Sequence, residues 1–392
     1  MPINQTHQST VLGAGILLLS LFLFTLTAVA QVQPGSRMQM ERVQGDEKSN
    51  TPAEKPDTLK TEEELYGSFE ANYREALRAI ETQQFPRART LLNECLRFNP
   101  RHESSLLLSA ELHSRAGEPQ KALEDFTTLL RLDPSNVDAL KQRALLYALL
   151  GRHERALEDL DAALKRKPDD ALLHYNRALT LQALADDPFS ELSIKPKDIL
   201  EVLDKTLELD PDLLEAYVRR GQHHALHNKP EEALKDFTLV LEHEPNRADV
   251  LTMRGQTYSI MEKHEKARAD YKRSQNLEPT DKTHRLLAAT YFRLGDLDAA
   301  LEQYDLALDA NPGDPALLLQ RASVFAMQDN PLDAIDEYSK VLEQNPLNGE
   351  ALMYRGMMRT LVHDFEQACP DLRKAMQLGQ EQARRYLEFY CN

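Results

Sequence analysis

Small and apolar residues recur at a nearly constant spacing over most of this chain. Prolines mark the repeat, because they follow one another at intervals of 34, 34, 43, 34, 34, 33 and 34 residues, at Pro100, Pro134, Pro168, Pro211, Pro245, Pro279, Pro312 and Pro346. Between consecutive prolines the same apolar positions return, as in Ala110, Ala122, Phe126 and Leu129. Self-similarity at a fixed period predicts one supersecondary unit that is stacked many times.

Each unit predicts a pair of amphipathic helices. In its second half the apolar residues fall at i, i+4 and i+7, as in Ala156, Leu160 and Ala163, which places them on one helical face. Gly117 and Gly151 stand between the two halves and favour a short turn. The residue before each closing proline disfavours helical geometry, so the second helix is expected to end there.

In this register the units resemble the tetratricopeptide repeat family from about Ser68 to Gly379. The resemblance implies an all-α fold in which about nine helix-turn-helix units stack as a right-handed superhelix, since one pair cannot bury its own apolar face. The first unit is degenerate in its leading helix, and the last has Gln380 where the others have proline. Residues 381–391 then predict a capping helix whose inward face carries Ala383, Tyr386, Leu387 and Tyr390.

The residues before the repeats predict export. Val11 to Ala30 is apolar and uncharged and ends in Ala28-Val29-Ala30, which indicates a cleaved signal peptide or an uncleaved N-terminal membrane anchor. The next stretch is rich in Gln, Ser, Pro, Lys and Glu and predicts a flexible polar linker. The expected organisation is a signal or anchor at 1–30, a linker at 31–66, a repeat domain at 67–379 and a capping helix at 380–392. We therefore expect a periplasmic, secreted or membrane-anchored protein.

The charge of the chain narrows the choice of partners. It carries 63 acidic and 47 basic residues, a formal net charge of −16. This balance argues against nucleic acid or an anionic lipid surface as the main partner, since both would be repelled at long range. No glycine-rich phosphate loop, serine elbow or paired-carboxylate motif stands outside the repeats. We therefore expect no catalytic residue and no cofactor.

Two groups of polar residues allow more than one interpretation. His223 and His227 are spaced i, i+4 and would present two imidazoles to a metal ion, but two ligands without a third make a poor site, so no metal is expected. An arginine also precedes the small residue of six first helices, at Arg143, Arg177, Arg220, Arg254, Arg321 and Arg355. This ladder either binds a series of partner carboxylates or forms structural ion pairs with neighbouring helices, and the second interpretation is favoured.

The three cysteines and one insertion complete the candidates. Cys369 and Cys391 lie on successive helices, so an antiparallel arrangement predicts a disulfide that ties down the cap; the alternative is two free thiols. Cys95 occupies a packing position and is expected in the core. The 43-residue interval adds a surface loop around Asp186 to Pro196, where Phe189 and Leu192 indicate either a contact site or a tolerated insertion.

The resemblance also implies where partners bind, because members of the family usually hold peptides in the concave groove made by the first helices. Carried onto this sequence, the lining is Lys141, Tyr175, Gln182, Val218, Gln222, Thr252, Gln256, Leu319, Ser323, Met353 and Met357. This mixture of amide, hydroxyl and apolar groups suits an extended peptide or a partner helix. The clamp with which some members hold a terminal carboxylate is incomplete: Lys141, Asn176 and Arg219 match it, but Leu145 and Glu215 do not.

The sequence therefore predicts a non-catalytic scaffold for protein or peptide partners, in a bacterial-type cell envelope or the secreted space. The oligomeric state is open, and contact with a membrane is expected only through the N-terminal segment. Two alternatives are a repeat-bearing enzyme of the glycosyltransferase type and a permanent structural subunit of an envelope complex. The asparagine ladder of those transferases is missing, because Gln142, Arg219 and Met253 stand where asparagine is expected and Asn176 alone fits.

Overall fold

The computed structural model describes residues 62–391. The signal peptide or anchor expected at 1–30 and most of the linker expected at 31–66 lie outside the described residues, although helix α2 already begins at Glu62. The described residues fold into nineteen helices, α2 to α20, and contain no strand. The predicted all-α repeat fold is confirmed. Among these helices none combines the length and the apolar content that a bilayer crossing requires.

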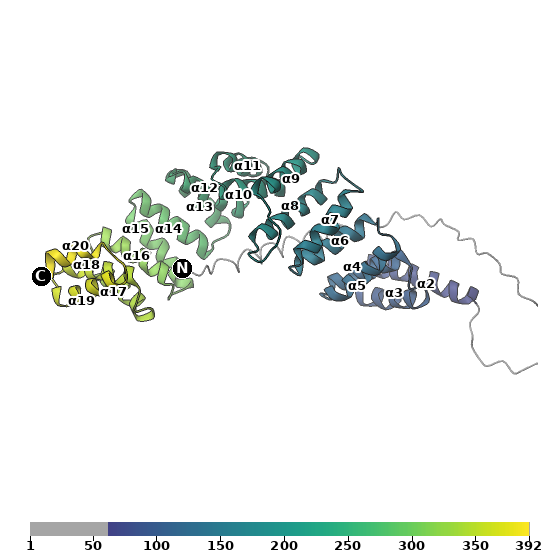
Figure 1. Cartoon of the computed structure of the whole chain (residues 1–392), viewed down its shortest axis with the longest axis horizontal. Coiled ribbons are helices and arrows are strands. Elements are labelled where there is room, and N and C mark those ends of the chain that lie inside the picture. Colours follow the sequence, from purple (N-terminus) through teal and green to yellow (C-terminus); the bar gives the residue numbers. More distant parts are fainter. Residues whose placement is uncertain (1–61, 392) are drawn as a thin grey trace, which may run out of the picture. The chain divides into compact units, whose positions relative to one another are not determined.

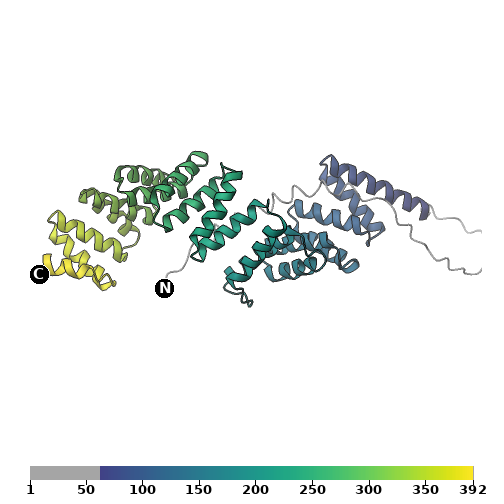
Figure 2. The ribbon, with the colours of Figure 1, turned by 90° about the horizontal axis from the view of Figure 1, so that it is seen from above.

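The helices form two compact units, one ending at Leu209 and the other beginning at Asp210. Helices of a pair lie side by side, first helix against second helix (Figures 1 and 2). The pairs of unit 1 are α2 (Glu62–Glu81) with α3 (Phe85–Phe98), α4 (Glu103–Arg115) with α5 (Pro119–Leu132), α6 (Val137–Leu149) with α7 (His153–Leu164), and α8 (Ala171–Asp186) with α9 (Pro196–Leu209).

Unit 2 contains five pairs and the cap. They are α10 (Leu214–Leu226) with α11 (Pro230–His243), α12 (Ala248–Ile260) with α13 (His264–Leu277), α14 (Asp281–Leu294) with α15 (Leu297–Ala310), α16 (Pro315–Met327) with α17 (Pro331–Gln344), α18 (Gly349–Leu361) with α19 (Phe365–Gln377), and the capping helix α20 (Ala383–Tyr390). The nine pairs agree with the number of repeats that the sequence predicts.

Side chains next to each turn explain where the helices begin. Asn136, Asp170, Asp314 and Asn348 precede first helices, and each side chain accepts a hydrogen bond from the backbone N–H three residues on. Prolines open several second helices, as in α5, α11 and α17, because a first-turn residue needs no N–H donor. The turn inside a pair requires a left-handed residue, which is glycine at Gly117, Gly151 and Gly295 but not at Asn228, Glu262, Asp329 and His363.

The core forms where a second helix presses its ring against the small residue of the first. A Cβ atom on Gly255 would lie 2.6 Å from the Tyr271 ring, and one on Gly221 would lie 2.8 Å from the Phe237 ring. Both rings are 1% exposed. The small residue is therefore needed for the close approach of the two helices of a pair.

The arginine ladder forms structural ion pairs, as the favoured interpretation predicts. Arg254 of α12 donates two hydrogen bonds, at 2.7 and 2.8 Å, to Asp270. This residue lies sixteen residues later in α13, the second helix of the same pair. A third donor reaches Thr238, sixteen residues back in the preceding second helix. The same forward contact joins Arg143 to Asp159, Arg220 to Asp236, Arg321 to Glu337 and Arg355 to Asp371. Each arginine of this ladder is thus used inside the array.

Arg177 shows what the insertion changes. It pairs with Asp161 of the preceding second helix at 2.7 Å, sixteen residues back. With the insertion, between the end of α8 at Asp186 and the start of α9 at Pro196, buried Val202 lies directly before Leu203. The five pairs named above carry the forward carboxylate at this position. Phe189 of the inserted loop is 89% exposed, as expected, and its role stays a prediction.

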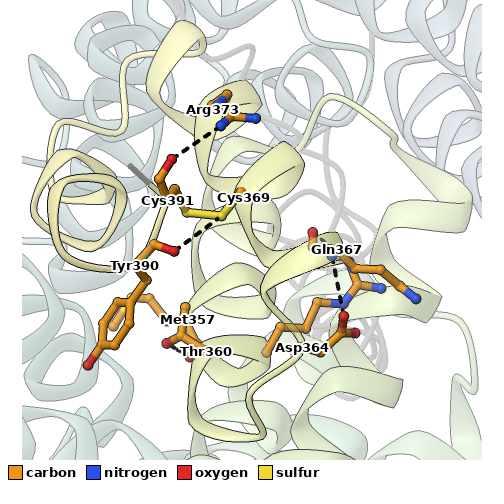
Figure 3. The surroundings of a disulfide bond; sticks show 9 residues. Met357, Thr360, Asp364, Gln367, Cys369, Arg373, Tyr390 and Cys391 are labelled. Carbon is orange, nitrogen blue, oxygen red and sulfur yellow. Dashed lines mark hydrogen bonds between the residues drawn. A yellow bond between two sulfur atoms is a disulfide. The ribbon is translucent and has the colours of Figure 1, made fainter.

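A disulfide holds the capping helix. Cys369 of α19 is bonded to Cys391, directly after α20, and Arg373 donates to the Cys391 carbonyl (Figure 3). This is the pairing that the sequence predicts, and Cys95 is buried as expected. One part of the cap was predicted wrongly, because Tyr390 is 48% exposed. Helix α20 ends at Tyr390. The Tyr390 ring stacks on Phe365 at the edge of the last pair instead of entering the core.

Candidate partner-binding groove

The predicted lining residues divide between the two units, and we describe each unit separately. Lys141 and Gln182 of unit 1 are half-buried. In unit 2 the half-buried members are Gln222, Gln256, Leu319, Ser323 and Met357. Four of these occupy one repeat position, directly after the small residue, and we call Gln222, Gln256, Ser323 and Met357 the groove row.

The other four predicted lining residues are buried and do not line an open surface. Tyr175, Val218 and Met353 are 3% exposed and Thr252 is 6% exposed. Each lies three residues before the small residue, as half-buried Lys141 and Leu319 also do, so the repeat position alone does not set the burial. Val218 packs in one cluster with Phe237 and Val250, for example. The Thr252 hydroxyl lies 2.8 Å from that of Ser274 in the second helix of the same pair.

Polar contacts orient Gln222 of the groove row and the hydroxyl of Ser259, which lies three residues after Gln256. The Gln222 amide donates to the Met253 sulfur at 3.1 Å, which joins the first helices of two successive pairs. Arg219 donates to the Gln222 carbonyl oxygen at 3.3 Å, while its own Nε is buried without a partner among the described residues. The Ser259 hydroxyl lies 3.3 Å from that of the buried Tyr271. These contacts orient amide and hydroxyl groups without covering them fully.

Arg247 neutralises the acidic end of the same helices. It precedes α12 and contacts Glu215 at 2.7 Å, Asp249 at 2.8 Å and Glu244 at 3.3 Å. Burial alone would raise the pKa of Asp249, but the hydrogen bond and charge of Arg247 outweigh burial and lower it. Glu215 is therefore paired and does not stand as the isolated repelling charge that the sequence indicated.

Glu111 is a groove residue that the sequence analysis missed. It follows Ala110 in α4, the position that Gln222 and Gln256 occupy in unit 2, and it is half-buried. Burial raises the pKa of its carboxyl to about 7; Arg115 and Lys141 lower it and Asp138 raises it. Its repeat position was a signal for the groove, but the burial depends on neighbours that the pattern does not give.

This carboxyl predicts a pH dependence of stability. The folded chain holds the Glu111 proton more tightly than the unfolded chain does, so the free energy of unfolding is expected to fall as pH rises from about 4.5 to about 7. Glu111→Gln should remove this part of the dependence and be relatively more stable at pH 8. Urea unfolding at pH 5 and pH 8 measures it, with exposed Glu124→Gln as control. Equal pH dependence in wild type and Glu111→Gln would contradict it.

His223 of α10 and His227, which directly follows the helix, lie as their spacing predicts. The rings of His223 and His227 are 4.2 Å apart between centroids, and His227 Nδ1 contacts the His223 carbonyl. His224 is buried, which lowers the pKa of its imidazole. Within residues 62–391 no group of three His, Cys, Asp or Glu side chains is arranged to hold a metal ion.

A shallow open depression of about 470 Å³ adjoins the last member of the groove row. It is lined by Met357 and by residues of the cap, Glu381, Gln382, Arg384, Arg385, Tyr386 and Glu388. Arg384 and Glu381 form an ion pair at 2.7 Å at this place. The depression extends the groove row of unit 2 onto α20.

Sequence profiles described as tetratricopeptide repeat match residues 107–171 and 143–185, residues 248–281 and residues 281–324. The chain contains tetratricopeptide repeats. The matched stretches lie in both units, and the match at 248–281 spans one helix pair, α12 with α13, in the register that the sequence analysis predicts.

One curated relative is the sperm-associated antigen 1 of Rattus norvegicus. It is 35% identical over 78 residues, which are 20% of this chain and 9% of that protein. The alignment therefore spans a small part of the relative.

Several solved structures align with about half of the chain. YrrB, described as a TPR protein with an unusual peptide-binding site, is 25% identical, covers 50% of this chain and 96% of its own, and gives a TM-score of 0.42. PilW, a type IV pilus biogenesis factor, is 22% identical over 53% of this chain and 93% of its own, with a TM-score of 0.46. MamA from Desulfovibrio magneticus RS-1 is 20% identical over 46% and 97%, with a TM-score of 0.42.

Proposed function

We propose that this chain is a non-catalytic scaffold that binds an extended peptide or a helical segment of a partner protein along its first helices. The observation that carries the proposal is the groove row of unit 2, where amide, hydroxyl and thioether side chains remain half-buried at one repeat position. The amide and hydroxyl groups of Gln222, Gln256 and Ser323 can pair with a partner backbone, and the thioether of Met357 can adapt to apolar side chains; Ala289 occupies this position in α14.

We also propose an exported location. The Cys369–Cys391 disulfide supports it, because structural disulfides persist in oxidising compartments and are rare in a reducing cytosol. The apolar segment Val11 to Ala30 supports it independently at the sequence level.

Site-specific photocrosslinking in the native cell tests the scaffold proposal. A photoreactive residue at Gln256 or Ser323 is expected to form adducts with a defined polypeptide. The matched controls are Glu242 and Asn276, which are exposed on second helices. Adducts of equal yield at all four positions would contradict groove binding. Replacing half-buried Leu319 and Met357 by Asp should abolish the adducts at Ser323, while circular dichroism verifies that the helices persist.

A further inference from the structure

A row of exposed apolar side chains follows the first helices of unit 2. The helices α10, α12, α16 and α18 each end in a large apolar residue, and we call Leu226, Ile260, Met327 and Leu361 the apolar edge. These side chains are 75%, 63%, 60% and 56% exposed. In the remaining pair Arg293 stands at this position, and it is exposed as well.

The apolar edge adjoins the groove row. Each of its members lies four residues after a member of the groove row, as Ile260 does after Gln256, so the two share one face of the helix. Scattered exposed apolar residues are ordinary on a protein surface. The same helix-terminal position in four of five pairs is a pattern, and burial within the described part of unit 2 does not account for it.

Carboxylates border the apolar edge on the side of the turns. Glu231, Glu232, Glu262, Asp329 and Glu366 follow the edge residues within the turn or the first turn of the second helix, and all are exposed. None of the five forms an ion pair with another residue of the described chain. Lys229, Lys263 and Lys266 lie on the same turns, but acidic side chains outnumber them.

We propose that the apolar edge of unit 2 binds an amphipathic helix of a partner protein, whose apolar side is flanked by lysine and arginine. The inference rests on the proposed function and names the kind of partner that the groove takes. A helix presents a continuous apolar strip with cations along its borders, which complements an apolar row bordered by carboxylates. The net charge of −16 also favours a positively charged partner.

Binding of designed peptides to the full chain tests this proposal. The probe is a synthetic amphipathic peptide of Leu and Lys with apolar residues at i, i+3, i+4 and i+7, compared with a Leu and Glu peptide of the same pattern. Fluorescence anisotropy should show the Leu/Lys peptide binding at least about tenfold more tightly. The double variant Ile260→Ser with Met327→Ser should weaken that binding at least about tenfold.

The matched control is Leu277→Ser with Leu347→Ser, which removes two exposed apolar residues of unit 2 outside the apolar edge. It is expected to bind the Leu/Lys peptide as the wild type does. Equal losses in the two double variants, equal affinity for the two peptides, or no binding would each overturn the proposal. So would self-association of the chain that the Ile260→Ser with Met327→Ser variant abolishes, since the occupant would then be a second copy.

The crosslinking test separates this inference from the proposed function. If adducts at Gln256 and Ser323 persist in the Ile260→Ser with Met327→Ser variant while the peptide test fails, the scaffold stands and the basic helical partner is wrong. Loss of the adducts in both the groove and the edge variants, together with selective Leu/Lys binding, supports both proposals.

Discussion

Replacing Arg254 with Ala is expected to lower the free energy of unfolding by about 3–5 kcal/mol, because it leaves a buried carboxylate without its partner. Asp270 is 4% exposed and accepts both of its short hydrogen bonds from Arg254. Those bonds also raise the pKa of the Arg254 guanidinium. Chemical denaturation followed by circular dichroism measures the loss.

Two comparisons make this result specific. Arg97→Ala removes an ion pair with Glu94 whose side chains are 75% and 47% exposed, and it should cost less than about 1 kcal/mol. Arg254→Met combined with Asp270→Leu removes both charges and should recover most of the loss. Similar costs for Arg97→Ala and Arg254→Ala would show that burial of Asp270 does not matter.

Breaking the Cys369–Cys391 bond is expected to have the second largest effect. The bond closes a loop with a sequence separation of 22, and loop-closure entropy gives it a contribution of about 3 kcal/mol. Because α20 packs mainly against α18 and α19, Cys391→Ser should loosen α20 and leave unit 1 unchanged. Hydrogen exchange resolved along the chain measures this difference.

Thiol chemistry provides the control for the disulfide. Cys95→Ala keeps the bond, so a reducing agent should loosen α20 in that variant as in the wild type. The same agent should have no further effect on Cys391→Ser. Unchanged exchange of α20 after reduction of the wild type would contradict the prediction.

The repeat architecture could be predicted from the sequence because its signals are local. Closing prolines, small residues and turn glycines act within one helix pair. Their periodicity can therefore be recognised without knowing how neighbouring pairs pack. The disulfide followed from the same local reasoning, since the last repeat helix and the capping helix are consecutive, and their antiparallel packing brings the two cysteines together. The ion pairs of the arginine ladder were also predictable, because each partner lies in an adjacent helix.

The groove was predicted less well because the exposure of a side chain depends on packing between neighbouring helix pairs. Val218 and Met353 share a helical face with Gln222 and Met357, and the sequence gives both the same periodicity. Neighbouring helices then cover the former and leave the latter half open. Burial of Glu111 also arises among several helices, so its raised pKa could not be derived from the chain pattern.

Ladder arginines that contact two second helices at once affect how the array of helix pairs unfolds. Arg254 of α12 donates hydrogen bonds to Asp270 of α13 and to Thr238 of α11, so one side chain connects three helices. When one pair unfolds, its arginine no longer binds the preceding pair. Unfolding should therefore spread over several adjacent pairs instead of ending at one. Mechanical or proteolytic damage to unit 2 would then appear as the loss of blocks of repeats.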